Sequence, residues 1–212
     1  MTPDTVLDRI RRQLAGRTPP PAPSVWRGRP PYEDPAAVLV AQLERNGAQA
    51  LIAPDAAARS AAIAALFDEL GVTRAVMNPD PGLADLDLPA RFPAVAWTIA
   101  GQVPPEALRG ACATADVGLS GATAALAETG SVVVESGPSR SRLVTLLPPA
   151  SIVVVHASAI VPDLFAWAAV RPAPVPANVV IISGPSKSAD IEQTLAVGVH
   201  GPGHLLVLVR QS

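Results

Sequence analysis

The sequence is poor in cysteine, in aromatic residues and in long apolar runs. Cys112 is the single thiol among 212 residues, so it cannot form an internal disulfide, and a reducing compartment is expected. One thiolate cannot hold an iron–sulfur cluster either, because such clusters need about four. No apolar run approaches the ~20 residues that cross a bilayer, and the acidic N-terminus does not resemble a secretory signal. We therefore expect a cytoplasmic protein without a membrane span or a cluster of its own.

Positive charge is also scarce. Sixteen Lys and Arg against 18 Asp and Glu give a net charge of −2, which provides no basic face for nucleic acid. The patterns GxxxxGKS or GxxxxGKT, helix-opening GxGxxG and GxSxG are missing, which argues against P-loop, dinucleotide and hydrolase-elbow sites. His200 and His204 are four residues apart, but the glycines and proline between them prevent a helix, so zinc spacing is missing. We expect no nucleic-acid partner, no metal and no cofactor.

Hydrophobic residues, in contrast, make up 49% of the chain and supply ample material for a core. Most apolar β-runs are continuous rather than alternating, as in strands that are covered on both faces. Strands that alternate with helices predict an α/β fold, a three-layer α/β/α sandwich with a largely parallel sheet. A Rossmann-like order fits the pattern equally well, and the strand order cannot be read from it. The expected strands are 49–53, 72–77, 94–99, 116–120, 131–135, 152–156, 179–183 and 205–209; the main expected helices are 35–46, 54–70 and 105–111.

The N-terminal part differs from the rest in composition. Residues 3–14 have an amphipathic pattern, with Val6, Leu7, Ile10 and Leu14 on one helix face. A proline-rich connector follows, too extended to be core. We expect an arm at 1–31, which docks on a partner or on the main body or is a frayed terminus, and one α/β domain at 32–212.

Reactive side chains gather among small residues in the C-terminal stretch 182–202. An apolar strand there breaks into a Gly/Ser turn that is expected to open a helix, where free backbone N–H groups favour an anion. A capping role accounts for one serine but not for the lysine, glutamate and histidine. The candidate ligand-binding residues are Ser183, Gly184, Ser186, Lys187 and Asp190, and the candidate catalytic residues are Glu192 and His200.

A second Gly-Pro-Ser turn spans residues 136–142. Ser136, Arg140 and Arg142 could grip a carboxylate or phosphate there, because guanidinium groups bind such oxyanions bidentately. If both turns lie at the carboxyl edge of one sheet, they could line a common cleft. A solvated loop is the alternative.

Glu128 is a third candidate. A short helix is expected at 122–127, and a carboxylate at its C-terminal end opposes the helix dipole. A residue placed against its local preference indicates another purpose. Alternatively, Glu128 is only a partner for a backbone amide or an arginine.

His200 is flanked by Gly198 and Gly201, so this loop can bring backbone close to a ligand. Imidazole can hold or release a proton near neutrality. If Glu192 or Asp190 orients one ring nitrogen, the other could act as acid, base or hydrogen-bond donor. The alternative is a histidine that fixes a turn.

Two blocks of the sequence resemble a known family. Residues 183–192 with 198–202, SGPSKSADIE and GVHGP, and residues 114–119 through 127–130 are similar to the lactate-utilization protein C family, the LUD domain. The resemblance extends from about residue 116 to the C-terminus. It implies a fold similar to the sugar-isomerase and CoA-transferase superfamily.

The resemblance also implies a role in oxidising L-lactate to pyruvate beside two iron–sulfur partner proteins. The leading hypothesis is a non-redox component of that system with a cleft for a small carboxylate or phosphate. Two enzyme alternatives remain: a CoA-transferase-like protein with Glu128 or Glu192 as nucleophile, and an ATP-dependent ligase with Lys187 and Arg140 on phosphate.

Overall fold

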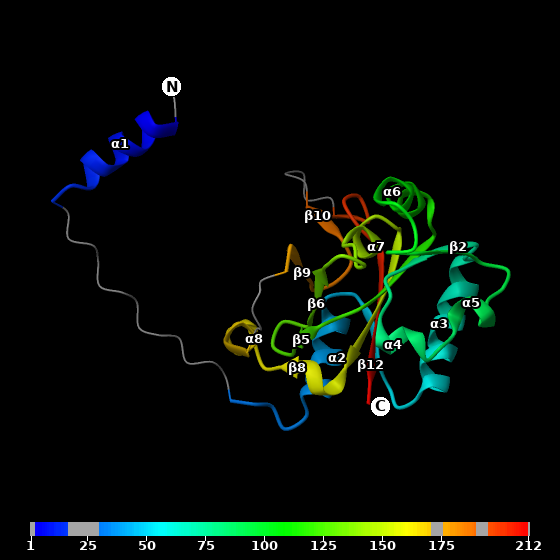
Figure 1. Ribbon diagram of the computed structural model, residues 1–212. Coiled ribbons are helices and arrows are strands. Elements are labelled where there is room, and N and C mark those ends of the chain that lie inside the picture. The colour runs from blue at the N-terminus through cyan, green and yellow to red at the C-terminus, as the bar shows by residue number, and fades with distance from the viewer. Residues whose placement is uncertain (1–2, 17–29, 171–175, 190–194, 212) are drawn as a thin grey trace.

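A six-stranded parallel sheet forms the centre of the molecule (Figure 1). The computed structural model describes residues 3–16, 30–170, 176–189 and 195–211. The strand order is β1-β12-β7-β4-β2-β3, and every neighbouring pair is parallel. The strands are β1 (Gln49–Ala53), β2 (Arg74–Met77), β3 (Ala96–Ile99), β4 (Val117–Gly121), β7 (Ala150–His156) and β12 (His204–Arg210).

The central strands are apolar on both faces. In β12, Leu206 and Leu208 pack into one core cluster, whereas Val207 and its alternate neighbours pack into another on the opposite face. In β7, Ile152 likewise packs into the first cluster and Val153 into the second. Side chains of a strand alternate between faces, so a strand covered on both sides must be a continuous apolar run. The expectation of an α/β fold with a largely parallel sheet is confirmed.

Three helices and the segments beside them cover the first face of the sheet. The helices are α3 (Ala56–Leu70), α4 (Pro81–Ala84) and α5 (Leu88–Arg91). Asp55 caps the start of α3 by accepting the backbone N–H of Ala58 at 2.8 Å, and Gly71 ends the helix in the left-handed conformation. Phe67 of α3 packs within this layer, with its ring 5.0 Å from that of Phe92.

The second face is covered by helices and a small sheet together. The helices are α2 (Pro35–Arg45), α6 (Pro105–Thr114) and the one-turn α7 (Leu143–Leu146). The small sheet has the order β8-β5-β6-β9, from β5 (Ala124–Leu126), β6 (Ser131–Ser136), β8 (Ile160–Val161) and β9 (Asn178–Ile182). Trp167 of α8 (Leu164–Val170) packs on its outer side. The small sheet therefore shares the third layer with helices.

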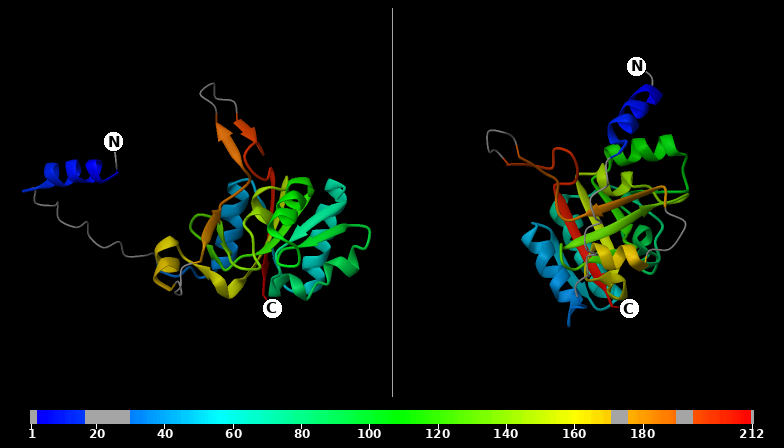
Figure 2. Two further views of the ribbon diagram at one scale, coloured as in Figure 1. Left: turned by 45° about the horizontal axis from the view of Figure 1, so that its top comes forward. Right: turned by 90° about the vertical axis from the view of Figure 1, so that its left-hand side faces the viewer.

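Three expectations fail in this layer. The runs at 131–135 and 179–183 are strands, but they belong to the small sheet rather than the main one. Residues 122–127 do not form a helix, because Ala124–Leu126 is a strand held between β6 and β8. The turn at 183–186 does not open a helix, because β10 (Lys187–Ala189) follows and pairs with β11 (Leu195–Val197) in a ribbon that projects from the body (Figure 2).

The N-terminal helix α1 (Pro3–Leu14) has the predicted bounds. Its apolar residues are exposed, from 39% for Val6 to 56% for Leu14. Within the described ranges, no helix has the length and apolar character needed to cross a membrane.

Candidate binding site at the carboxyl ends of two strands

β2 and β4 are parallel neighbours, but the connections that follow them lead in opposite directions along the sheet, from β2 to β3 and from β4 to β7. The chain leaves β2 toward α4 on the first face, whereas it leaves β4 toward the small sheet on the second face. Open α/β sheets bind ligands at such a switch point, beyond the carboxyl ends of the strands. The residues that follow β2 and β4 are therefore the first place to search for a site.

Asn78 directly follows β2 and is fully buried. Its side-chain Nδ2 donates to Ser120 Oγ at 3.0 Å and to Ser141 O at 3.1 Å, and its Oδ1 accepts the Ser141 backbone N–H at 2.9 Å. One amide thus binds the 136–142 turn to the ends of two main-sheet strands. These bonds hold the Ser141 end of the turn against the sheet, whereas residues 137–139 and Arg142 are exposed.

Arg140 in this turn is held in the same way. Its Nη2 donates to Gly121 O at 2.8 Å and forms an ion pair with Asp80 Oδ2 at 3.1 Å. A Cβ on Gly121 would lie 2.0 Å from the Asp80 carboxylate, so only glycine permits this approach. Asp80 Oδ1 in turn accepts the Gly82 backbone N–H at 2.9 Å. These two contacts therefore position the guanidinium beside the carboxyl end of β4.

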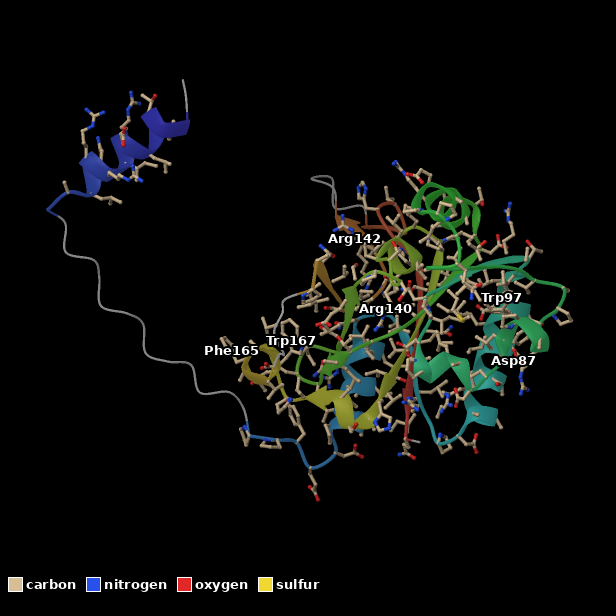
Figure 3. All side chains as sticks on the ribbon, viewed as in Figure 1. Asp87, Trp97, Arg140, Arg142, Phe165 and Trp167 are labelled. Atoms are coloured by element: carbon tan, nitrogen blue, oxygen red, sulfur yellow. The ribbon has the colours of Figure 1, made fainter. Side chains whose placement is uncertain are left out.

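A cavity of about 620 Å³ lies beside this turn; we call it the arginine cavity. Ser136, Arg140, Arg142 and Asn178 line it, with Leu108 of α6 on its apolar side. Ser136 Oγ, Arg140 Nε and Asn178 Oδ1 are buried atoms with no hydrogen-bond partner in the described part of the chain. Both arginines are labelled in Figure 3, in the region that Figure 1 shows around α7. Two guanidinium groups, one of them already paired with Asp80, and two unsatisfied donors, Ser136 Oγ and Arg140 Nε, thus line one space, which suits a small anion.

The C-terminal turn lines a different space, of about 250 Å³, which we call the serine cavity. Ser183, Gly184, Ser186 and His200 line it. β6 and β9 are antiparallel, so Ser136 lies opposite Asn178 whereas Ser183 lies at the other end, 2.7 Å from Ser131 between hydroxyl oxygens. The two turns therefore do not form the common cleft that the sequence allowed.

Lys187 lies away from both linings. Its Nζ donates to the backbone carbonyl of Asn46 at 2.6 Å, at the end of α2. A cation is favourable there, because the carbonyls at a helix C-terminus carry partial negative charge. This described contact places Lys187 at the end of α2, and its role in ligand binding stays a prediction.

Glu128 also lies outside both described linings. It follows a strand and not a helix, so the unfavourable helix dipole inferred from the sequence does not exist. Its backbone N–H donates to Pro162 O at 2.9 Å, and its side chain is half-buried. Asp190 and Glu192 lie outside the described residues.

Sequence reasoning missed Asn78, Asp80 and Gly121. A signal for the first two exists, because Asn78-Pro79-Asp80 follows a predicted strand immediately, where a parallel sheet places binding groups. No local signal marks Gly121, since its role depends on a carboxylate about 40 positions away in the sequence.

Two further titratable groups lie outside these sites. Burial raises the pKa of the Cys112 thiol to about 11, only partly offset by a backbone hydrogen bond, so this thiol is a poor nucleophile. At Asp116, burial acts to raise the pKa, but hydrogen bonds from Thr73 and Arg74 and the charge of Arg74 outweigh it, so the pKa is lowered. Both groups are structural.

The model of the LUD domain family matches residues 36–209 of this chain. The chain belongs to the LUD domain family. The match begins far before residue 116, so the family fold also includes the first part of the sheet, outside the two resembling blocks. The LUD domain of this chain therefore contains both cavities.

Two curated relatives and one solved structure illustrate the similarity. The chain is 43% identical over 105 residues to a lactate utilization protein C from Exiguobacterium, a match that covers 46% of this chain and 45% of that protein. It is 43% identical over 94 residues to the Bacillus subtilis protein of the same name, covering 42% and 39%. The matches thus span less than half of these relatives.

The solved structure supports the fold alone. A DUF162 family protein from Deinococcus radiodurans superposes with a TM-score of 0.55 at 24% identity, covering 82% of this chain and 98% of the other. The likeness therefore covers most of this chain and supports its fold.

Proposed function

We propose that this LUD domain protein works in lactate utilization as a non-redox component, beside iron–sulfur partner proteins, and that its arginine cavity holds a small carboxylate or phosphate. The names of the relatives support a role in lactate utilization. One structural observation supports the proposed ligand. Arg140 is held by Asp80 and Gly121, and it lines a cavity together with Arg142. The partners would hold the redox centres, and this chain would bind an acid.

The unsatisfied atoms of the arginine cavity favour a hydroxy acid. A carboxylate accepts hydrogen bonds, which suits Arg140 Nε and the guanidinium of Arg142. A hydroxyl both donates and accepts, which suits Ser136 Oγ and the side-chain amide of Asn178. Lactate carries both groups on adjacent carbons. A plain monocarboxylate leaves the serine and the asparagine unsatisfied, and leaving buried polar groups unpaired weakens binding.

Calorimetric titration with lactate, propionate and pyruvate tests this assignment. Arg142→Gln should weaken lactate binding by about tenfold, because it removes a charge-assisted hydrogen bond. Ser136→Ala should lower the affinity for lactate by about three- to tenfold and leave that for propionate nearly unchanged. Arg109→Gln, an exposed arginine on α6, is the matched control. Equal affinities for lactate and propionate would contradict the assignment of a hydroxy acid. If no acid binds, the arginine cavity is not an acid-binding site.

Partner binding needs a separate test. An untagged pull-down from lactate-grown cells should recover iron–sulfur proteins with this chain. Recovery of the chain alone would contradict the subunit role without affecting the cavity. The CoA-transferase-like and ligase-like alternatives stay predictions of the sequence, since Lys187 contacts a helix end and no described contact brings Glu128 to a cavity.

A further inference from the structure

We propose that the serine cavity is a second binding site, for a small uncharged molecule with a hydroxyl or amide group on a short aliphatic body. This inference is independent of the function proposed for the arginine cavity. It begins with Ser151 in the middle of the apolar strand β7. Ser151 is 1% exposed, and its Oγ has no hydrogen-bond partner in the described ranges.

Ser151 faces the second layer, on the same side of β7 as Val153 and Val155, and it lines the serine cavity. A buried hydroxyl without a partner destabilises a fold, whereas a valine at this place would match its neighbours. Among the described residues this hydroxyl has no partner, and it lines a space in which a bound molecule would supply one.

A chain of hydroxyl groups reaches the same cavity from the small sheet. Thr129 Oγ1 lies 2.7 Å from Ser131 Oγ, which lies 2.7 Å from Ser183 Oγ. Ser183 lines the cavity. Because hydroxyls donate and accept, this chain can reverse its direction and present either a donor or an acceptor to a ligand.

The rest of the lining decides the charge and shape of the ligand. Leu146, Ile182 and Leu205 supply aliphatic walls, and no lysine, arginine, aspartate or glutamate belongs to the described lining. The exposed imidazole of His200 is its single titratable side chain. An ion would leave water without a fixed counter-charge, which is unfavourable. The lining thus fits a neutral molecule with a polar group at one end.

1,2-Propanediol and lactate share a three-carbon skeleton and differ in charge, so they form a matched pair of probes. In amide NMR titrations of the full chain, propanediol should shift the signals of Ser186, Gly201 and Leu205, and lactate should not. Ser151→Ala should weaken propanediol binding by about three- to tenfold. Ser60→Ala is the control, because Ser60 is another buried serine with an unpartnered Oγ but lies outside the described lining.

Four outcomes would overturn the proposal. They are shifts that do not saturate, shifts unchanged in Ser151→Ala, lactate binding at these residues as well as propanediol does, and ordered water at Ser151 Oγ that propanediol does not displace. If Ser151→Ala does not fold, Ser183→Ala removes the end of the hydroxyl chain and must weaken propanediol binding instead.

Discussion

At the scale of single residues, Asp116 shows how one carboxylate can join two strands. Its Oδ2 accepts the backbone N–H groups of Thr73 and Arg74 at 2.9 and 2.8 Å and the Thr73 hydroxyl at 2.9 Å. Asp116 immediately precedes β4, and its two partners lie at the start of β2. The ionised form is the one that these donors stabilise, which is why the pKa is lowered.

Asp116→Asn should therefore reduce the free energy of unfolding by about 1 to 2 kcal/mol near neutral pH, because a neutral amide accepts these bonds less strongly. The folded-state pKa lies below that of the unfolded chain, so the ionised group stabilises the fold above pH ~4. This contribution is lost as the pH falls through the folded-state pKa. Denaturant melts from pH 7 to pH 2.5 should show the two proteins converging at acid pH. Glu69→Gln, an exposed carboxylate on α3, should show a much smaller difference.

Residue-scale contacts are also where sequence reasoning fails. The sequence marks Arg140 as a candidate anion ligand but not the Asp80 and Gly121 contacts that fix it, because these are brought near only by the sheet. The same limit applies to Lys187, whose partner at the end of α2 is 141 positions away. The local sequence shows which chemical group a side chain carries. It does not show which distant residue that group will contact in the fold.

At the scale of elements, α7 depends on a glycine in the neighbouring strand. A Cβ on Gly118 of β4 would lie 1.7 Å from the backbone carbonyl oxygen of Val144 in α7. The helix therefore sits directly on the sheet, and no flexible side chain can yield to a larger residue.

Gly118→Ala should lower the free energy of unfolding by about 3 kcal/mol, at the upper end of overpacking effects, because backbone must move. Gly110→Ala in α6 is the matched control. Nothing lies within 4 Å of a Cβ at that position, so alanine should raise helix stability by about 0.5 to 1 kcal/mol. Thermal melts of both variants check the pair. A Gly118→Ala protein as stable as the parent would show that α7 does not pack as described.

The elements could largely be predicted, but not their assignment to sheets. The runs at 131–135 and 152–156 are both continuous and apolar, since each strand is buried on both faces, so periodicity does not separate the small sheet from the main one. The alanine-rich stretch at 122–127 has helix propensity, and pairing of Ala124–Leu126 with two strands overrides it. Each of these predictions was wrong because strand pairing in the folded protein, rather than local sequence, sets the structure there.

At the scale of the whole molecule, we propose that residues 1–31 are an arm and 32–212 the folded domain. Tyr32 already packs against the core of the second layer, whereas the apolar residues of α1 remain exposed. The family match, which begins at residue 36, agrees with a core that does not need the arm.

Deleting residues 1–31 should change the melting temperature by no more than about 2 °C, because the apolar residues of α1, the described helix of this segment, are exposed. Calorimetry on both forms tests this. The shortened protein should also recover less of any partner in a pull-down, since the apolar face of α1 is then missing. A large loss of thermal stability would show instead that the arm is part of the core.

The single turn α7 is a wall common to two spaces. Leu143 at its start lines the arginine cavity, and Thr145 and Leu146 at its end line the serine cavity. Thr145 Oγ1 also donates to the carbonyl of Arg142 at 3.1 Å, which links the turn to the residue just before it. A molecule that displaced this turn from one side would change the free energy of occupancy on the other. Thermodynamic linkage makes that effect equal in both directions, whichever cavity is filled first.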